Sequence, residues 1–223
     1  MQNTLEAQSR FDHLVIGASA LDVGISWFEK QSGIQLPMGG EHPLMGTHNH
    51  LSAITDNTFL EVIAINPDAE PPTRPRWFGL DDESVQQRLA KSPTLLTWVV
   101  ACSDLRAALE RLQELGIDAG ESVTQRRGNL TWQIAVRPDG GLLENGCFPV
   151  LIEWPKGVNP VISMTRQGLD IERLVLVHPE PDLLLAGLEV INYSSNVEVL
   201  PEKGASRHMA ATLRAGTRIF SIV

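Results

Sequence analysis

The sequence predicts an α+β fold built from two tandem β-α-β-β-β modules, and three observations support this prediction. A strand-like run followed by an amphipathic helix and a glycine occurs twice in the 223 residues, and further strand-like runs follow each helix. Each copy then ends on an apolar pair and a glutamate, Glu61 in the first and Glu153 in the second. Self-similarity of this kind indicates two structurally equivalent units.

The first copy begins with a strand-like run at residues 11–18 (FDHLVIGA) and an amphipathic helix at residues 21–31, which Gly33 ends. Two β-rich runs follow, at residues 46–54 and 58–65. The Asp-Asn pair between these runs is typical of a hairpin turn.

The second copy has the same order. A strand-like run at residues 95–102 leads into a helix at residues 104–115, and Gly116 ends that helix. Strand-like runs at residues 130–136 and 148–154 complete this copy, with a glycine-rich loop between them.

The remaining segments predict a connection and a C-terminal extension. Residues 67–93 are rich in proline and charge, and we expect a loop with a short helix at residues 84–90. A strand at residues 174–177, a helix at residues 181–190 and a final hairpin predict a βαββ-like extension, an incomplete third copy. The expected boundaries are residues 1–66 for the first module, 67–93 for the connection, 94–157 for the second module and 158–223 for the extension.

Composition excludes several classes of function. The net charge of −9 argues against nucleic acid and anionic membrane surfaces, which bind basic proteins. Two cysteines exclude a disulfide framework, and no apolar run approaches the ~20 residues of a membrane span. The N-terminus lacks the features of a signal peptide. We therefore expect a cytoplasmic protein with a small-molecule ligand, and a homodimer is compatible with the sequence.

Three residues suggest a site with metal-binding chemistry. His13 lies within the first strand of module one, and Glu61 and Glu153 lie within apolar strands near the ends of the two modules. A buried carboxylate is costly unless it is paired or bound to a metal. One imidazole and two carboxylates suit Zn, Ni, Co, Mn or Fe. The alternatives are a hydrogen-bonded structural histidine and glutamates on the solvated face of a sheet.

The other histidines carry weaker signals. His48 and His50 share one face of a strand, and His50 is the better candidate for an additional metal ligand. His42, His178 and His208 lie in a loop or at the ends of elements, and nothing in their spacing indicates a ligand role.

Four further residues and Asn49 are candidates for substrate binding. Arg126 and Arg127 precede a Gly-Asn turn, where a guanidinium group can hold a carboxylate or phosphate. A solvated hairpin end is the alternative. Trp132 and Trp154 lie on strands of module two and form either a cavity wall or part of the core.

Several stretches together resemble one family. The runs FDHLVIGA, GTHNHL, FLEVI, RRGNLTW and FPVLIEW are similar to the glyoxalase-like domain proteins of the vicinal oxygen chelate superfamily. Glyoxalases, extradiol dioxygenases, epimerases and the fosfomycin- and bleomycin-resistance proteins are members. The resemblance extends from Phe11 to about Pro155 and implies paired modules that form a cupped mixed sheet around a divalent metal ion.

The resemblance also implies a ligand set. His13, Glu61 and Glu153 match three of the four usual ligand positions, and the fourth falls at Thr97, which is a poor ligand. Three protein ligands with open positions, recruitment of His50, or no metal at all are the remaining possibilities. With a metal bound, Glu153 or Glu61 would also act as the catalytic base.

These inferences predict a metal-dependent lyase or isomerase that acts on a small carbonyl-bearing or oxygen-rich metabolite. A metal-free protein that sequesters a small molecule between Trp132 and Trp154 is the first alternative. An extradiol-type dioxygenase is the second, and His50 would complete its iron site.

Overall fold

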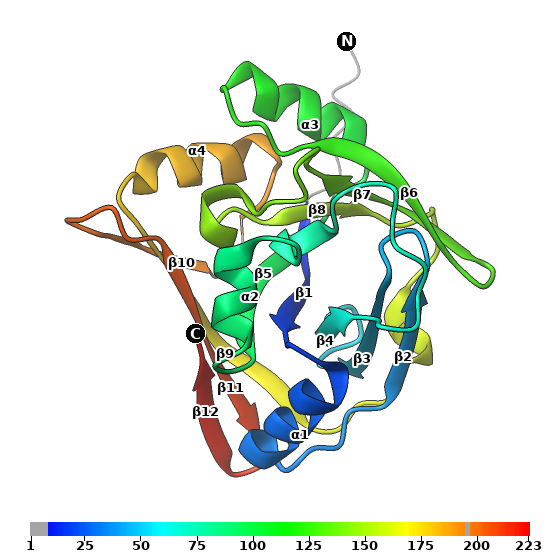
Figure 1. The fold of residues 1–223 in the computed structure, drawn as a ribbon. Coiled ribbons are helices and arrows are strands. Elements are labelled where there is room, and N and C mark those ends of the chain that lie inside the picture. Colours follow the sequence, from blue (N-terminus) through cyan, green and yellow to red (C-terminus); the bar gives the residue numbers. More distant parts are fainter. Residues whose placement is uncertain (1–8, 195–196) are drawn as a thin grey trace.

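The computed structural model describes residues 9–194 and 197–223. Its elements in chain order are β1 (Arg10–Gly17), α1 (Leu21–Ser32), β2 (Met38–His42), β3 (Thr47–Ala53), β4 (Phe59–Ile65), η1 (Trp77–Gly79), α2 (Glu83–Leu89), β5 (Thr94–Ala101), α3 (Leu105–Glu114), β6 (Glu121–Arg127), β7 (Leu130–Val136), η2 (Leu143–Gly146), β8 (Val150–Glu153), η3 (Pro160–Ser163), β9 (Leu169–His178), α4 (Pro181–Val190), β10 (Val197–Pro201), β11 (His208–Ala215) and β12 (Arg218–Ile222) (Figure 1).

The two modules form one mixed sheet. Its strand order is β2-β3-β4-β1-β5-β8-β7-β6. Within each module the first and last strands pair in parallel, and the antiparallel pair of β1 and β5 joins the modules at the centre. The sheet curves until its edge strands β2 and β6 approach each other, which leaves a concave face on the inside (Figure 1). The predicted α+β fold with tandem βαβββ modules and a cupped mixed sheet is thus confirmed.

Local sequence explains the limits of the two module helices. Gly33 and Gly116 both have a left-handed backbone, with φ of 76° and 77°, that disfavours side chains with a Cβ. The N–H group of Gly33 donates to the carbonyl of Glu29 and so satisfies the last turn of α1. At the start of α3, the Asp104 carboxylate accepts a hydrogen bond from the N–H of Ala107.

The edge strand β2 has no strand-like signal in its own sequence, Met-Gly-Gly-Glu-His, and forms because its backbone pairs with β3. Close packing explains why two positions of this strand are glycine. A Cβ atom on Gly39 would lie 2.2 Å from Oδ1 of Asn49, and one on Gly40 would lie 2.8 Å from Cδ of Arg127. The strand can therefore lie close to both polar side chains only because these two positions are glycine.

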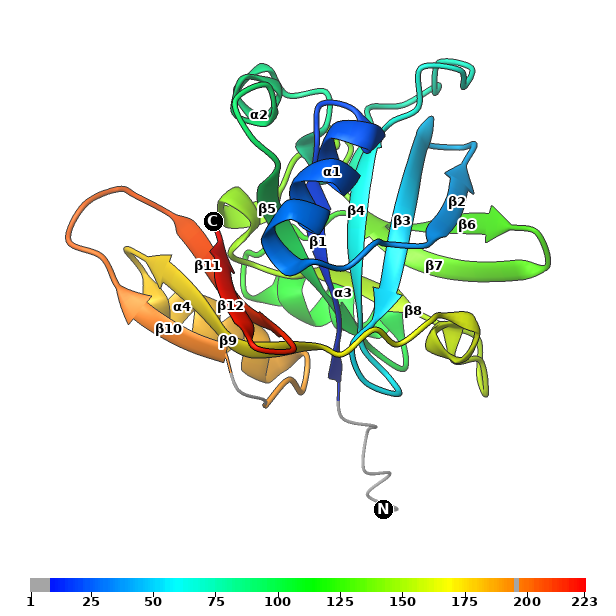
Figure 2. The same ribbon diagram turned by 90° about the horizontal axis from the view of Figure 1, so that it is seen from below.

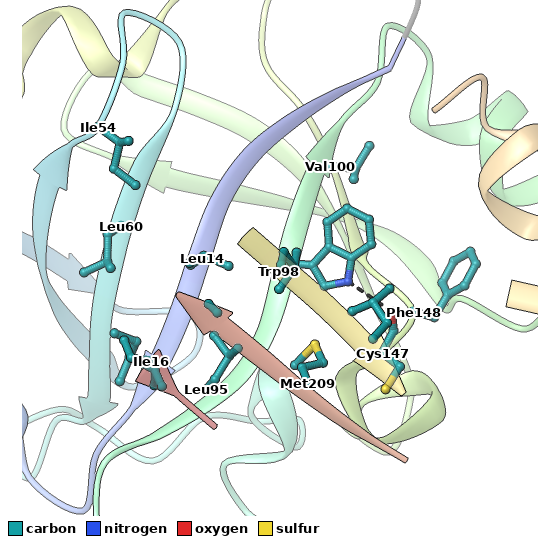
Figure 3. Packing of buried hydrophobic residues seen from close by; sticks show 14 of the residues in the cluster. Leu14, Ile16, Ile54, Leu60, Leu95, Trp98, Val100, Cys147, Phe148 and Met209 are labelled. Carbon is teal, nitrogen blue, oxygen red and sulfur yellow. Dashed lines mark hydrogen bonds between the residues drawn. The ribbon is translucent and has the colours of Figure 1, made fainter. Parts of the chain in front are cut away.

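The convex face of the main sheet carries the larger hydrophobic core. Helix α1 packs on β3 and β4, and α3 packs on β6, β7 and β8. The sheet of the C-terminal extension lies between them, against β1 and β5 (Figure 2). Figure 3 shows Met209 of β11 beside Leu95 and Trp98 of β5, where the indole Nε1 of Trp98 donates to the carbonyl of Cys147 at 3.0 Å.

The C-terminal extension contains one strand more than the sequence analysis predicted, β10. Its strand order is β10-β9-β11-β12, with β10 parallel to β9. In the two modules, by contrast, two other strands separate the strand that follows the helix from the first strand. The extension is therefore a different topology and not an incomplete third copy. No helix in the described part of the chain is long and apolar enough to cross a membrane.

The connection between the modules fills part of the concave face. A second hydrophobic cluster joins this segment to inward residues of β1, β5, β7 and β8. The segment contributes Trp77 of η1, the adjacent Leu80, and Val85 and Leu89 of α2. These four side chains of the connection are therefore buried. The rest of the concave face, toward β3, β4 and β7, holds a cavity.

Candidate functional site

The cavity has a free volume of about 40 Å³, room for about three water molecules. Aromatic rings form much of its wall, namely Phe59, Trp77, Phe78, Trp132 and Trp154. Polar side chains from β1, β2, β3 and β4 form one side of it. These polar groups are almost completely buried, so each must find a partner within the protein or in a ligand.

His13 lies at the centre of the polar side, between two carboxylates. Its Nδ1 is 2.8 Å from Oδ1 of Asp12, and its Nε2 is 3.6 Å from Oε2 of Glu61. The imidazole stacks on the ring of Phe59 with 4.2 Å between centroids. A break in the pairing of β1 with β5 falls between Phe11 and His13. This β-bulge explains how consecutive residues, Asp12 and His13, can contact each other.

Asp12 also connects the two modules. Its Oδ2 accepts a hydrogen bond from the indole Nε1 of Trp154 at 3.0 Å, and the guanidinium of Arg10 lies 3.2 Å away. Asp12 is fully buried. A side chain of module two therefore fixes the carboxylate that orients His13, although the histidine belongs to module one. The sequence analysis missed Asp12 because a bulge in a strand leaves no clear mark in a single sequence.

Asn49 links Glu61 to a second histidine. Its Nδ2 donates to Oε1 of Glu61 at 2.5 Å and lies 3.5 Å from Nε2 of His42. Nδ1 of His42 is 3.0 Å from Oγ1 of Thr47. An amide donor facing Nε2 makes that nitrogen the acceptor, so the proton of His42 lies on Nδ1. His42, which showed no functional signal in the sequence, is thus part of the site.

The protonation states follow from burial and partners. Burial by itself lowers the pKa of His13, but Asp12 and Glu61 outweigh it and raise the pKa above 6.5. Burial raises the pKa of Glu61, but His13 and Asn49 outweigh it and lower the pKa below 4.5. Burial lowers the pKa of His42 to about 4. The site therefore favours an imidazolium and a carboxylate facing each other, beside a neutral histidine.

Two predicted metal ligands lie outside the cavity. Glu153 belongs to the convex face, where its Oε2 accepts from the N–H of Leu105 at the start of α3 at 2.7 Å. His50 also faces outward, and its Nδ1 donates to the carbonyl of Leu36 at 2.6 Å. Side chains alternate along a strand, so Asn49 faces inward and His50 does not. The structure thus brings His13, Glu61 and Asn49 together, but not Glu153 or His50.

The register of the repeat explains why Glu153 is on the other face. His13 and Thr97 each lie eight residues before the first residue of their module's helix, so Val15 and Val99 correspond. Val15 pairs with Glu61, whereas Val99 pairs with Val150. Val150 therefore takes the place of Glu61 in module two. Glu153 lies three residues further on, and an odd offset reverses the face of the sheet.

The substrate-binding candidates also separate. Arg127, Trp132, Trp154 and Asn49 line the cavity. Arg126 is exposed on the opposite face of β6. Thr97, at the position that corresponds to His13, is buried and donates its hydroxyl to the carbonyl of Gly146 at 3.3 Å.

The donor set does not fit a divalent metal ion. No three His, Cys, Asp or Glu side chains among residues 9–194 and 197–223 are grouped so that they could hold one. His13 Nδ1 is engaged by Asp12, and Oε1 of Glu61 accepts from Asn49. Two donors from module one remain, and the corresponding positions of module two are Thr97 and Val150.

Comparison with known proteins identifies the family. The family profile "Glyoxalase-like domain" matches residues 11–191, more than half of the chain, so the protein belongs to the glyoxalase-like domain family of the vicinal oxygen chelate superfamily. The comparison with curated proteins gave no match.

One solved structure shares the fold over nearly the whole chain. A hypothetical protein from Staphylococcus aureus superimposes with a TM-score of 0.60 at 16% identity, covering 97% of this chain and 86% of that one. Methylmalonyl-CoA epimerase from Mycobacterium tuberculosis gives 0.41 at 21% identity, over 70% of this chain and 93% of that one. A hypothetical protein from Bacillus halodurans gives 0.45 at 14% identity, over 68% and 99%.

Proposed function

We propose that this glyoxalase-like protein is an isomerase or lyase that moves a proton at a carbon next to a carbonyl group of a small molecule. The observation that carries the proposal is the pair His13 and Glu61, a buried cation and carboxylate whose Nε2 and Oε2 atoms are 3.6 Å apart at the cavity. This separation is longer than a hydrogen bond, so both atoms keep capacity for a ligand.

The proposed step uses only this chain's residues. Oε2 of Glu61 removes the proton from the carbon, and the electron pair of the broken C–H bond moves onto the carbonyl oxygen to give an enolate. Nε2–H of His13 donates to that oxygen and stabilises its negative charge. Where that carbon carries a hydroxyl group, Glu61 returns the proton to the former carbonyl carbon and the hydroxyl proton passes to the enolate oxygen, which completes an isomerisation. Return of the proton to the same carbon regenerates the starting molecule. No step involves a metal ion, since the donor set is incomplete.

The supporting side chains hold this pair in place. Asp12 orients the imidazole through Nδ1 and favours its charged form. Asn49 fixes the other oxygen of Glu61, which leaves Oε2 as the atom on the side of His13. The aromatic wall leaves room for few water molecules, which strengthens the electrostatic interactions inside the cavity.

Hydrogen–deuterium exchange tests the proposal. Pyruvate, hydroxypyruvate and dihydroxyacetone are incubated with the protein in D₂O, and NMR follows the loss of the proton signals next to the carbonyl. We expect at least one probe to exchange, with a loss of about 100-fold or more in Glu61→Gln. Glu153→Gln is the matched control, because it changes the corresponding glutamate of the repeat outside the cavity, and it should exchange like wild type.

Chelation provides a second arm of the same experiment. Dialysis against EDTA should leave the exchange rate unchanged. A loss of exchange that added Zn, Ni, Co, Mn or Fe restores would contradict the proposal and favour the metal-dependent mechanism. Absence of exchange with every probe, at the rate of Glu61→Gln, would overturn the proposed proton transfer.

A metal-free binding protein is the second candidate. The aromatic walls favour it, because an apolar cavity with a few polar groups can hold a ligand without any reaction. Under this alternative, probes would bind in the cavity and quench tryptophan fluorescence, but neither wild type nor any variant would catalyse exchange.

A further inference from the structure

The cavity differs in charge from the protein that surrounds it. The whole chain carries a net charge of −9. Among the described residues that line the cavity, however, Glu61 is the only carboxylate, while His13 and Arg127 are cations. The other lining histidine, His42, is neutral near pH 7, since burial lowers its pKa to about 4. Behind the lining, the Asp12 carboxylate is paired with the Arg10 guanidinium at 3.2 Å. His13 and Glu61 offset each other, so Arg127 leaves a charge of about +1.

Arg127 lines the cavity and has no ion-pair partner among the described residues, and both properties suit an anionic ligand. Its Cζ atom lies 6.0 Å from the ring centroid of Trp132, and its side chain passes close to Gly40 across the gap between β6 and β2. No described carboxylate forms an ion pair with it. The aromatic ring holds the guanidinium plane without using its N–H donors. These donors therefore remain available for a ligand.

Trp77 has a buried N–H group without a partner among the described residues. Its ring lines the same cavity, and it contacts the ring of His42 edge-on at 4.9 Å. Trp77 is 4% exposed, and its Nε1–H has no acceptor among the described residues. A buried N–H group without an acceptor destabilises the protein, and a ligand oxygen within reach would remove this cost.

We propose that the ligand of this cavity is a small carboxylate monoanion, held by Arg127 over the ring of Trp132, with its carbonyl end toward His13 and Glu61. The inference rests on the proposed function, because it names the ligand class of the same site. A single negative charge balances the cavity, whereas a phosphate dianion would leave an uncompensated charge there. The planar carboxylate also matches the fork of the guanidinium group.

The volume limits the size of this ligand. About 40 Å³ admits a few heavy atoms, so the ligand is either a two- or three-carbon acid or the carboxylate end of a longer molecule that extends from the cavity. Pyruvate and pyruvamide are a matched pair of probes for this proposal, because they have the same number of heavy atoms and differ in charge.

Titration with these two probes tests the inference. Quenching of tryptophan fluorescence reports binding, since Trp77, Trp132 and Trp154 wall the cavity. At constant ionic strength we expect wild type to bind pyruvate at least about tenfold more tightly than pyruvamide. Arg127→Gln should lose this preference. Arg126→Gln, the neighbouring arginine on the opposite face, should keep it. Equal binding of both probes, no binding of either, or equal losses in the two arginine variants would overturn the inference.

Glu61→Gln separates this inference from the proposed function. The variant removes the only carboxylate of the described lining, so pyruvate should bind more tightly than to wild type, while proton exchange is lost. If Glu61→Gln binds pyruvate more weakly than wild type, the charge argument is wrong. If wild type binds pyruvate with the expected preference but catalyses no exchange with any probe, the anion site stands and the proton transfer fails.

Discussion

The two modules contribute opposite kinds of side chain to one cavity. Module one provides His13, Glu61, Asn49 and His42, which form a connected polar chain. Module two provides mainly apolar walls, with Ile134 and Ile152 beside its two tryptophans, and Arg127 is its one charged side chain among the described lining residues. The repeat therefore preserves the backbone but not the chemistry. The apolar half keeps water away from the polar half, and a low dielectric strengthens the ion pair there.

Replacing the corresponding residues of the two first strands gives the largest expected effect. His13→Leu leaves the carboxylates of Asp12 and Glu61 buried without their shared cation, so we expect a loss of about 3–5 kcal/mol in the free energy of unfolding. Thr97→Val removes one hydroxyl donor and should cost about 1 kcal/mol. Urea unfolding at pH 7 measures both values.

The double variant His13→Leu with Glu61→Leu controls for the loss of the charge itself. It should be more stable than His13→Leu alone, because one unpaired buried carboxylate is removed. Equal losses of unfolding free energy in His13→Leu and Thr97→Val would contradict the difference between the modules, because they would show that His13 stabilises no buried carboxylate.

Acid should lower the free energy of unfolding through His42, which lies on the edge strand β2 of module one. His42 has a pKa of about 4 when folded and 6.5 as its ordinary value, so the unfolded chain binds more protons between these pH values. The stability that neutral His42 provides is therefore complete above pH 6.5 and lost as the pH falls toward 4, a difference of roughly 3 kcal/mol.

The variant His42→Gln isolates this contribution. Gln125 is the buried polar residue of the other edge strand, β6, so the substitution gives β2 the same non-titrating side chain. The difference in unfolding free energy between wild type and variant should shrink from pH 7 to pH 4. A difference independent of pH would mean that His42 has the same pKa in the folded and unfolded chains, against this prediction.

The smallest expected effect concerns the hydrogen bond that Trp154 of module two donates to Asp12 of module one. Asp12 raises the pKa of His13, so Asp12→Asn should lower it, and the alkaline limit of the exchange activity should move to lower pH. Trp154→Phe removes the indole donor to Asp12 but keeps the carboxylate, and should reduce the rate without this displacement. An unchanged pH profile in Asp12→Asn would contradict the role given to Asp12.

Much of the fold was predictable because it depends on patterns with a short period. The alternation of apolar residues, the amphipathic helices and the terminal glycines Gly33 and Gly116 marked both modules. The edge strand β2 and the strand β10 were missed, since partner strands stabilise them more than their own residues do.

The candidate site was predictable only in part. His13 and Glu61 stand out because polar residues within apolar strands are unusual, and these two do meet. Glu153 carried the same signal but serves the start of α3, because its register places it on the convex face. His42 and Asp12 gave no signal, since a polar residue in a loop-like or edge segment is common in any sequence.

By itself the sequence determined the family, the two modules and the identity of the charged residues within the strands, because these depend on residue order alone. The tertiary structure decided which of those residues share a cavity. A shift of a single residue in strand pairing reverses every side chain, and a bulge at Asp12 brings neighbours into contact that a regular strand would separate. The location of Glu153 and the partners of His13 follow from this geometry.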